Sequence, residues 1–566
     1  MTMSPLAINI GVSGHRDIPA KDWPKLKETL ATELNSLKEQ FPHSSINVLS
    51  GLAEGADQLM AHVALQLNFN LIGVLPFEID EYEKDFATEE SLEQFRHYLS
   101  QCSEITICRR EAHVPRDSGY SELAKVLVQF SDLVIVLWDG VVETNQDGTI
   151  SSPLAGGTAD VVNMCLEGLV DDRSLLFSKP NKTFCKWLAA NRERHNTLPA
   201  TIGNPEIIGT WKPILLKGEQ DIRLFNEILL KTERFNVNAL GVKQEAKTAS
   251  REFLLGPTSS QKDLAAINKL IDAYTVADCL AQLRQKQRLT SIKSITSLSF
   301  IAILAQQIYV SLYPNWLWFS LHLFLVIVAV GIYRIFFVGT DTKEEQFVEW
   351  RVFAEDLRVQ IFWYLSGISD HCANYYRTTK LNEMDWIVDN LNKLMLNVVP
   401  PVDCDIAFVR QQWILDQRNY FVGQRGERGR AASYFLKAKR LQNTAIVLFC
   451  SAIILMFVSV IKVHTDFFPV MSTSVFFVII AMLFITSALI KTFAVQMGFE
   501  ELSQRYLRTG YYFQQAMDKL ALLDRHNQQD TVAYQKIIKT IGIEALNENA
   551  AWLQLHKMNA YKVQVS

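Results

Sequence analysis

The sequence is poor in several features that identify large classes of proteins. Its eight cysteines include no Cys-x-x-Cys pair, a spacing common in redox motifs and zinc sites, and their scatter is unlike a disulfide framework. We therefore expect reduced thiols facing the cytosol and no metal site. The formal net charge is −4, so the basic excess typical of nucleic-acid-binding proteins is missing and no nucleic-acid partner is expected. Residues 1–5 contain no basic cluster, which argues against a signal peptide.

Two motifs of nucleotide chemistry are also missing. The chain contains neither a Walker A loop nor the G-x-G-x-x-G turn of dinucleotide-binding folds. ATP hydrolysis of the P-loop type and hydride transfer therefore have no support in the sequence.

Long apolar segments are present in the second half of the chain. They cover residues 294–312, 316–338, 444–461 and 467–490. Each is close to the roughly 20 residues that a helix needs to cross the hydrocarbon layer. Because they form two closely spaced pairs, we expect four membrane-spanning helices arranged as two hairpins.

The basic residues predict how these hairpins are oriented. Lysines and arginines flank the pairs at residues 284–293, 437–440 and 491, whereas the loops at 313–315 and 464–466 contain none. Basic residues accumulate on the cytoplasmic side of a membrane. We therefore expect both loops outside and both termini in the cytoplasm, in the inner (plasma) membrane of a bacterium.

Few polar residues interrupt the predicted spans. Gln306, Gln307 and His322 could hydrogen-bond between helices or line a pore. Mid-membrane Asp and Glu are missing, which disfavours a proton-coupled transporter, and no broken helix supports a small-solute transporter or constitutive channel.

Apolar stripes with helical spacing lie between and after the spans. One of them comprises Trp350, Phe353, Leu357, Ile361 and Tyr364, which builds one apolar helix face. The predicted organisation is a nucleotide-binding domain at 1–245, an amphipathic coupling helix at 246–293, a first transmembrane hairpin at 294–338, a cytoplasmic helical region at 339–443, a second hairpin at 444–490 and cytoplasmic helices at 491–566.

The first 170 residues alternate apolar runs with helical segments. The runs lie at residues 7–12, 46–49, 71–75 and 133–138. Strands alternating with helices indicate a parallel sheet covered on both faces. The predicted fold class is thus an α/β Rossmann-like N-terminal domain with a parallel sheet, followed by an all-α four-helix transmembrane region with long cytoplasmic helices.

Glycine-rich turns follow three of these runs, and another opens a later helix. Glycine lets backbone N–H groups approach a ligand closely, and helix N-termini attract phosphate. In open α/β sheets such turns converge at the carboxyl edge, where ligands bind. The predicted ligand-binding residues are Gly11, Ser13, Gly14, His15, Arg16, Ser50, Gly51, Glu54, Gly55, Asp57, Asp139, Gly140, Gly156, Gly157 and Thr158.

Two residues of this region allow alternative interpretations. Arg16, next to His15, could bind phosphate through both guanidinium arms or form a surface salt bridge. Tyr120, in the segment 116–120, could stack on a base or act as a packing residue.

These turns resemble a known superfamily. Residues 11–16 (GVSGHR), 50–57 (SGLAEGAD) and 132–140, with Gly156-Gly157-Thr158, are similar to the SLOG superfamily, which groups the Smf/DprA DNA-processing proteins with the LOG enzymes. The resemblance covers roughly residues 7–171. It implies a Rossmann-like fold that binds a nucleotide-derived ligand, such as a cyclic nucleotide or an ADP-ribose derivative, and no other cofactor.

The chain departs from the catalytic pattern of the LOG-type hydrolases. Those enzymes carry a Pro-Gly-Gly-x-Gly-Thr turn followed by a glutamate, and a catalytic arginine upstream. Here Ala155 precedes Gly156-Gly157-Thr158, and Asp160-Val161-Val162-Asn163 follows without the glutamate. The departure favours binding without turnover and no catalytic residue, although Asp160, Glu54 or Asp139 could act as an acid or base.

A second resemblance concerns the helices around the spans. Residues 274–287, Trp350-Arg351 with Glu355 and Arg358, and Tyr506 resemble the SLATT group of membrane effectors. In bacterial conflict systems these effectors are often linked to SLOG sensors.

The combination implies a homo-oligomeric sensor that gates or disrupts the bilayer when a nucleotide second messenger binds, as an effector of antiphage (abortive infection) defence. The alternative is a membrane-tethered nucleotide phosphoribohydrolase or N-glycosidase.

Overall fold

The computed structural model describes residues 5–108, 115–141, 156–169, 183–193, 211–212, 219–256, 264–311, 322–328, 330–331, 340–375, 384–401, 404–424, 426–465, 473–525 and 531–565. By its internal contacts the chain forms two compact units. The first contains residues 1–248, 261–276 and 370–399, and the second contains residues 249–260, 277–369 and 400–566.

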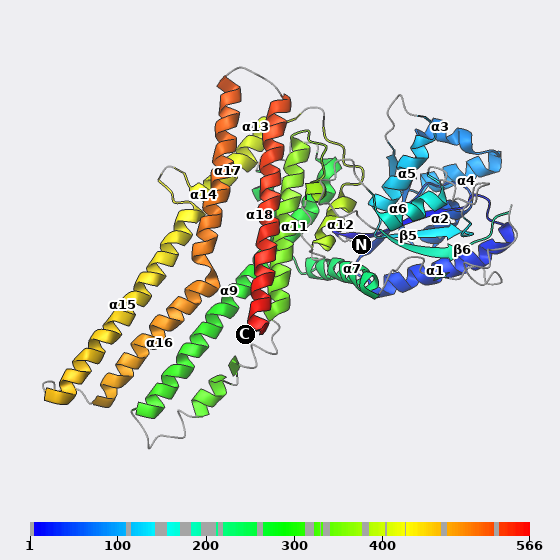
Figure 1. Cartoon of the computed structure of the whole chain (residues 1–566). Coiled ribbons are helices and arrows are strands. Elements are labelled where there is room, and N and C mark those ends of the chain that lie inside the picture. The colour runs from blue at the N-terminus through cyan, green and yellow to red at the C-terminus, as the bar shows by residue number, and fades with distance from the viewer. Residues whose placement is uncertain are drawn as a thin grey trace, which may run out of the picture. The chain divides into compact units, whose positions relative to one another are not determined.

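The first unit is built on a seven-stranded sheet (Figure 1). Its strands are β1 (Ala7–Gly14), β2 (Ser45–Ser50), β3 (Asn70–Leu75), β4 (Glu104–Ile107), β5 (Leu133–Trp138), β6 (Phe184–Ala189) and β7 (Trp211–Lys212), in the order β4-β3-β2-β1-β5-β6-β7. The first six strands run parallel, and β7 pairs antiparallel with β6. The predicted α/β fold with a parallel sheet is confirmed.

Both faces of this sheet are buried, as a parallel sheet requires. Every residue of β5 is buried, and alternate side chains enter different cores. Leu133, Ile135 and Leu137 pack into the core that contains α1 (Trp23–Gln40) and α2 (Ala56–Gln66). Val134, Val136 and Trp138 pack into the core that contains α5 (Ser118–Gln129) and α6 (Thr158–Glu167) on the other face. The continuous apolar run at 133–138 therefore reflects burial on two sides.

Further helices complete the first unit. They are α3 (Ile79–Tyr82), α4 (Glu89–Ser100), α7 (Glu219–Ala239), α12 (Asp385–Leu394) and the first residues of α9 (Asn268–Ser311). Thus α12 belongs to the first unit although it follows α11 (Thr340–Leu365) of the second unit in the sequence.

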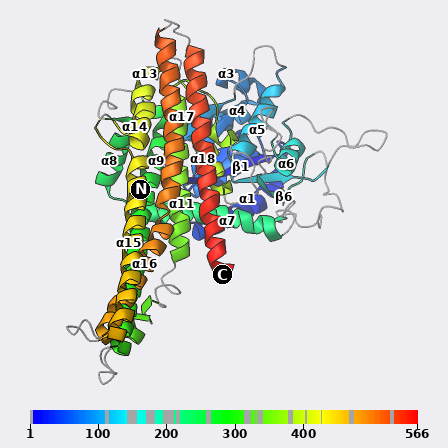
Figure 2. The same ribbon diagram turned by 60° about the vertical axis from the view of Figure 1, so that its left-hand side comes forward.

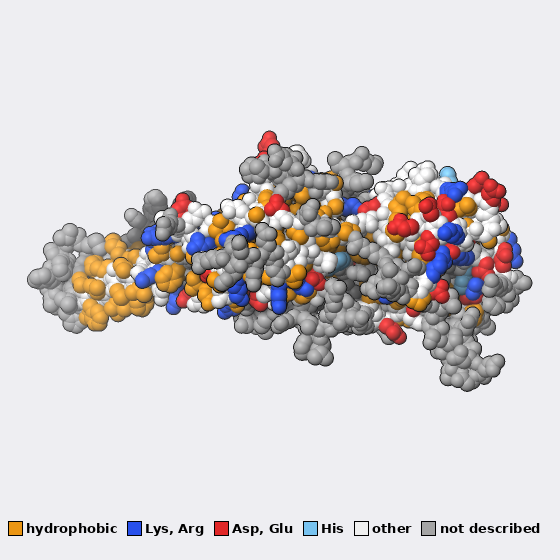
Figure 3. Space-filling view, turned by 90° about the horizontal axis from the view of Figure 1, so that it is seen from above, with side chains coloured by type: hydrophobic (Ala, Val, Ile, Leu, Met, Phe, Trp, Pro, Cys, Tyr) orange, Lys and Arg blue, Asp and Glu red, His pale blue; other side chains and the backbone are white. Residues whose placement is uncertain are grey.

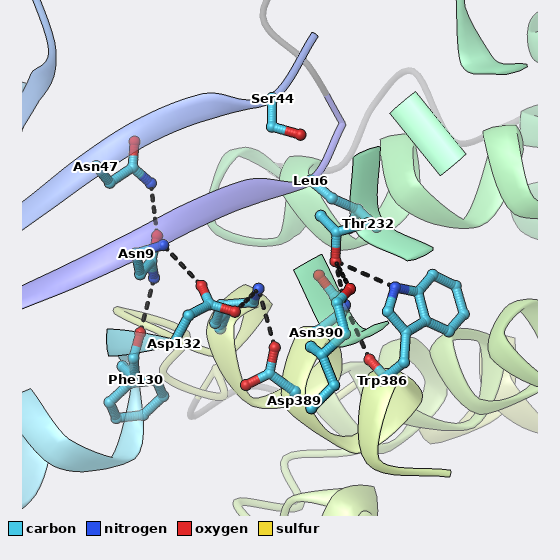
Figure 4. Close-up of polar contacts among 12 residues, drawn as sticks. Leu6, Asn9, Ser44, Asn47, Phe130, Asp132, Thr232, Trp386, Asp389 and Asn390 are labelled. Atoms are coloured by element: carbon cyan, nitrogen blue, oxygen red, sulfur yellow. Dashed lines mark hydrogen bonds and ion pairs between the residues drawn. The ribbon is translucent and has the colours of Figure 1, made fainter. Parts of the chain in front are cut away.

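A network of buried polar side chains holds α12 within the first unit (Figure 4). Lys393 Nζ lies 2.7 Å from Asp132 Oδ1 and 3.0 Å from Asp389 Oδ2. Asp132 also accepts the backbone N–H of Asn9 at 2.8 Å, at the start of the central strand. Trp386 Nε1 donates to Thr232 Oγ1 of α7 at 3.1 Å. These contacts fix α12 at the amino edge of the sheet, opposite the predicted ligand-binding edge.

The second unit is helical (Figures 1 and 2). Beside the rest of α9 and α11 it contains α8 (Gln244–Leu255, from Ala249 on), α13 (Ile406–Val409), α14 (Asp416–Val422), α15 (Arg430–Thr465), α16 (Thr473–Met497), α17 (Phe499–Arg525) and α18 (Thr531–Val565). Helices α18 and α11 pack closely at Gly542 of α18, where an added Cβ would lie 2.3 Å from Trp363 Nε1 of α11.

Three segments of the described residues are long and apolar enough to cross a membrane. They cover 265–307, 430–460 and 475–523, and they overlap most of the predicted first, third and fourth spans. The predicted second span, at 316–338, lies largely outside the described residues, as do most of the loops at 313–315 and 464–466. Apolar side chains such as Val447 and Phe457 of α15 are exposed on this unit, and Figure 3 shows hydrophobic side chains gathered in a patch. The chain is a membrane protein by these features.

The segment predicted as one coupling helix, 246–293, is divided in the structure. Most of it lies in two helices, α8 and α9, and Gly256 with φ +71° follows the end of α8. Helix α9 then continues without interruption from the first unit into the predicted first span, ending at Ser311.

Candidate functional site

The strand order creates a switch point between β1 and β5. From β1 the chain proceeds through β2, β3 and β4 on one side, then returns to β5 and β6 on the other. Crossovers that diverge from two adjacent strands leave a crevice at their carboxyl ends, where ligands of open α/β folds bind. The residues after Gly14 and Trp138 therefore form the centre of the candidate site.

His15 and Asp139 join the ends of these two strands. His15 Nε2 lies 3.0 Å from Asp139 Oδ1, and both side chains are buried. Burial alone would raise the pKa of Asp139, but hydrogen bonds from His15 and from the Val141 N–H, with the charges of His15 and Arg192, lower it below its usual value. The pair thus connects the carboxyl ends of β1 and β5 at the switch point.

The backbone of His15 also anchors the turn that follows β2. Its N–H donates to Leu137 O at 3.1 Å, and its carbonyl accepts the Ala56 N–H at 3.0 Å. Gly55 precedes Ala56 with φ +74°, and an added Cβ there would lie 2.3 Å from His15 O. Positive φ combined with this close approach requires glycine. The first two predicted turns therefore meet, as the sequence indicated.

We expect Gly14→Ala to destabilise the protein. Its Cβ would lie 2.4 Å from Ala56 Cβ and 2.6 Å from Leu137 O, and overpacking of this kind costs about 1–3 kcal/mol. The measurement is the unfolding temperature of the purified full-length protein. Gly241→Ala is the matched control, because its Cβ would come no closer than 3.5 Å to Asn238 O. Equal unfolding temperatures for the two variants would show that the turns do not meet this tightly.

Arg16 presents an accessible positive charge at this edge. Its side chain is 42% exposed, with a guanidinium nitrogen 3.8 Å from Glu54 Oε2, and the guanidinium lies over the Tyr120 ring at 5.6 Å. Tyr120 packs edge-on against Phe77 and donates its hydroxyl to Asp85. Tyr120 is accordingly a packing residue that supports Arg16, and the exposed guanidinium can still bind an anion.

Asp57 lies in the first turn of α2, beside Arg16. Its carboxylate accepts the Ala53 N–H at 3.3 Å. The group is partly accessible at the surface, yet burial raises its pKa from 3.8 to about 7, against the effects of the Ala53 and Gly51 N–H groups and of Arg16. The candidate site therefore contains a carboxyl group that changes its charge near neutral pH.

We expect Asp57→Asn to stabilise the protein at about pH 8 more than at about pH 5. Between 3.8 and about 7 the folded state holds a proton that the unfolded state has released. The stability that the protonated Asp57 contributes is therefore lost as the pH rises through this window. Asparagine is neutral at every pH, so the variant does not lose stability there. Unfolding temperatures of the full-length protein at both pH values test this, with the exposed Asp80→Asn as control. A gain that does not depend on pH would contradict the assignment.

The glycine turn that opens α6 lies at the same edge of the sheet. Gly156 has φ +74°, and its Cβ would lie 2.4 Å from the carbonyl carbon of Tyr120. Asp160 Oδ2 accepts the Gly156 N–H at 2.8 Å, so this carboxylate organises its own turn. Neither α2 nor α6 has a side-chain cap, and glycine occupies the N-cap position of both helices. Both helix N-termini therefore lie at this edge without a capping side chain, although in α2 the Ala56 and Gln58 N–H groups already donate to His15 O and Ala53 O.

The structure does not bring every predicted residue to this edge. Gly11 lies inside β1 under α5, where a Cβ would be 2.7 Å from Ser131 Oγ, so glycine is required there for packing. Ser13 is still within β1. Ser50 is buried and accepts the Leu52 N–H at 3.1 Å, which shapes the second turn. Gly51, Gly140, Gly157 and Thr158 lie at the turns as expected.

Two features of the site escaped the sequence analysis. Arg192, just after β6, binds Asp17 at 3.0 Å and brings a second guanidinium to the carboxyl edge. The Tyr82 hydroxyl donates to Gly51 O at 3.0 Å and so stabilises the turn that follows β2. A parallel β6 next to β5 would have predicted the place of Arg192, but the apolar run at 184–189 was too short to recognise.

The residues of the second resemblance also come together, in the second unit. Asp278 Oδ1 lies 3.7 Å from Arg351 Nη1, and Arg351 Nη2 lies 2.5 Å from Glu355 Oε1. Arg358 pairs with Glu355 and donates to Gln417 of α14 at 3.1 Å. This network links α9, α11 and α14.

The polar residues considered for a pore are described only in part. Gln306 and Gln307 lie near the end of α9, and Gln306 is exposed. His322 is exposed in a short helical stretch between residues whose structure is not described. Among the described residues no group of His, Cys, Asp and Glu side chains could hold a metal ion.

The sequence was compared with known proteins. It matches no protein-family model, and it matches no curated protein.

Proposed function

We propose that the protein is a nucleotide-responsive membrane effector. A nucleotide-derived second messenger binds the carboxyl edge of the sheet in the first unit, and binding makes the membrane permeable. In this proposal the protein acts as a homo-oligomer in the inner membrane of a bacterium, with both termini in the cytoplasm, as an effector of antiphage defence.

One observation carries the proposal. The exposed Arg16 guanidinium lies at the switch point, and the N-termini of α2 and α6 lie at the same edge, with glycine and no capping side chain at each. Arginine and helix N-termini are the two devices that proteins use most readily to bind phosphate. A phosphate of the ligand would lie at Arg16, with its charge also favoured by both helix dipoles.

Helix α9 connects the unit that contains the candidate site with a span candidate. It begins within the first unit and ends within the second, in one helix of 44 residues that includes a span candidate. A ligand changes the population of an open state only through its difference in affinity for the two states. A 100-fold preference for the open state would shift the equilibrium by roughly 2.7 kcal/mol, which is enough to open a minor state.

The test uses purified full-length protein and a panel of cyclic nucleotides and ADP-ribose derivatives. A rise in unfolding temperature identifies a ligand, and the same ligand is then added to protein in dye-filled vesicles. Dye release on addition of the ligand is the expected result. A ligand that raises the unfolding temperature yet releases no dye would refute gating.

A membrane-tethered phosphoribohydrolase or N-glycosidase is the second candidate. Asp57 favours it, because a carboxyl with a pKa of about 7 suits a general acid. The other carboxylates are engaged: Asp139 with His15, and Asp160 with the Gly156 turn. Chromatography of the bound nucleotide decides between the two. Recovery of intact ligand supports the sensor, whereas free base or ribose phosphate, lost in Asp57→Asn, supports the hydrolase.

A further inference from the structure

A groove of about 530 Å³ opens between α9 and α16 in the second unit. Its size falls within the roughly 300–1,000 Å³ of small-molecule sites. One charged side chain, Lys293, lines it together with the hydroxyl side chains Thr296, Ser297 and Thr486 and with apolar side chains that include Phe300 and Phe493.

The groove lies at the level where the predicted first and fourth spans leave the hydrocarbon layer. Lys293 immediately precedes the apolar segment of α9, and Lys491 immediately follows that of α16. Both helices are span candidates. The inference rests on the proposed orientation, in which the end rich in basic residues is cytoplasmic and the groove faces the inner leaflet of the bilayer.

The charge in the groove is available to a ligand. Lys293 is exposed and makes no hydrogen bond or ion pair with the described part of the chain. The threonine hydroxyls already donate to their own helices, Thr296 to Ile292 O at 2.9 Å and Thr486 to Met482 O at 2.6 Å. One cation therefore faces a lining whose other side chains are apolar or carry hydroxyl groups.

The lining contributed by α9 changes from charged to apolar along the helix. Phe300 follows Lys293 by seven residues, which places it roughly 10 Å further along the helix axis. A ligand that matches this order has an anionic group at one end and a hydrocarbon chain beyond it. Basic pockets between spanning helices on the cytoplasmic side bind anionic lipid head groups.

We propose that this groove binds one anionic phospholipid of the inner leaflet. The phosphate lies at Lys293, hydroxyls of the head group donate to the threonine oxygens, and one acyl chain follows Phe300 along α9. The inference does not depend on the nucleotide proposal, since the lipid site lies entirely within the second unit.

The test counts phosphatidylglycerol molecules that stay on full-length protein extracted from mixed phosphatidylcholine and phosphatidylglycerol vesicles, using native mass spectrometry. Lys293→Gln is expected to weaken retention about fivefold, the fold-change that corresponds to roughly 1 kcal/mol per lysine near an anionic surface. Lys491→Gln is the matched control, because this exposed lysine on α16 does not line the groove, and its retention should not change. Equal losses of retained phosphatidylglycerol in both variants would show that the lipid binds non-specifically. Unchanged retention in Lys293→Gln would show that the groove holds no lipid site. Either result overturns the proposal.

A second variant separates a lipid from a protein segment in the groove. Ser297→Trp fills the space with an indole, so it should abolish specific retention of phosphatidylglycerol while the unfolding temperature stays unchanged. Unchanged retention, or a large fall in unfolding temperature, would mean that part of this chain or a second copy occupies the groove, which also overturns the proposal.

Discussion

Arg16→Ala is expected to weaken nucleotide binding about 10- to 100-fold while the protein remains folded. A hydrogen bond to a charged partner contributes about 1.5–3 kcal/mol, which corresponds to this range. The side chain is 42% exposed and pairs only loosely with Glu54, at 3.8 Å, so little stability depends on it. Calorimetric titration of full-length protein with the ligand found in the nucleotide panel measures the affinity.

Arg96→Ala is the control for this variant. Arg96 is an exposed arginine on α4, paired with Glu83 at 2.6 Å, and its loss changes the net charge by the same amount as the loss of Arg16. Native affinity in Arg96→Ala together with a large loss in Arg16→Ala would assign the effect to the site. Equal affinities in the two variants would place the phosphate elsewhere.

Lys393→Met is expected to cause the largest loss of stability of any substitution discussed. The lysine side chain is 6% exposed and that of Asp132 is 1% exposed. Burial raises the pKa of Asp389 well above its usual value, and the neighbouring Asp132 raises it further. Lys393 therefore balances mainly the charge of Asp132. Removing one partner of a buried pair costs about 3–5 kcal/mol because an unpaired charge remains.

The double variant Asp132→Asn with Lys393→Met isolates that unpaired charge. It should recover much of the lost stability, since asparagine can remain buried as a neutral group beside methionine. Lys269→Met provides the comparison, because its pair with Glu104 is largely exposed and such pairs contribute roughly 0–1 kcal/mol. Chemical unfolding of full-length protein measures all four forms. Similar losses in Lys393→Met and Lys269→Met would contradict the buried network.

The parallel sheet, and the glycine turns that meet at its carboxyl edge, could be predicted from the sequence for physical reasons. Parallel strands buried on both faces read as continuous apolar runs, as at 133–138, and the glycine turns after them have few alternative uses. The place of Gly11 within the strand could not be predicted, because a pattern does not show that β1 continues to Gly14 and that Gly11 packs under α5. Strand ends depend on pairing partners that are distant in the sequence.

Long-range contacts explain what the sequence could not predict about the helical part. The segment that contains α12 reads as an ordinary amphipathic helix between two membrane hairpins. Its place in the first unit depends on Lys393 meeting Asp132, two residues 261 positions apart. The continuity of α9 was also hidden, because its amphipathic start and its apolar end read as two different elements.

Ligand-dependent dye release from vesicles that contain native protein, Arg16→Ala or Arg96→Ala is the most direct test of the proposed function. With the nucleotide identified by thermal shift held at a concentration that saturates the native protein, we predict release by the native protein and by Arg96→Ala, and little release by Arg16→Ala. Recovery of release by Arg16→Ala at about 10- to 100-fold higher ligand would match its weaker binding. Equal release by all three proteins, with or without nucleotide, would contradict a gate that is controlled from this edge of the sheet.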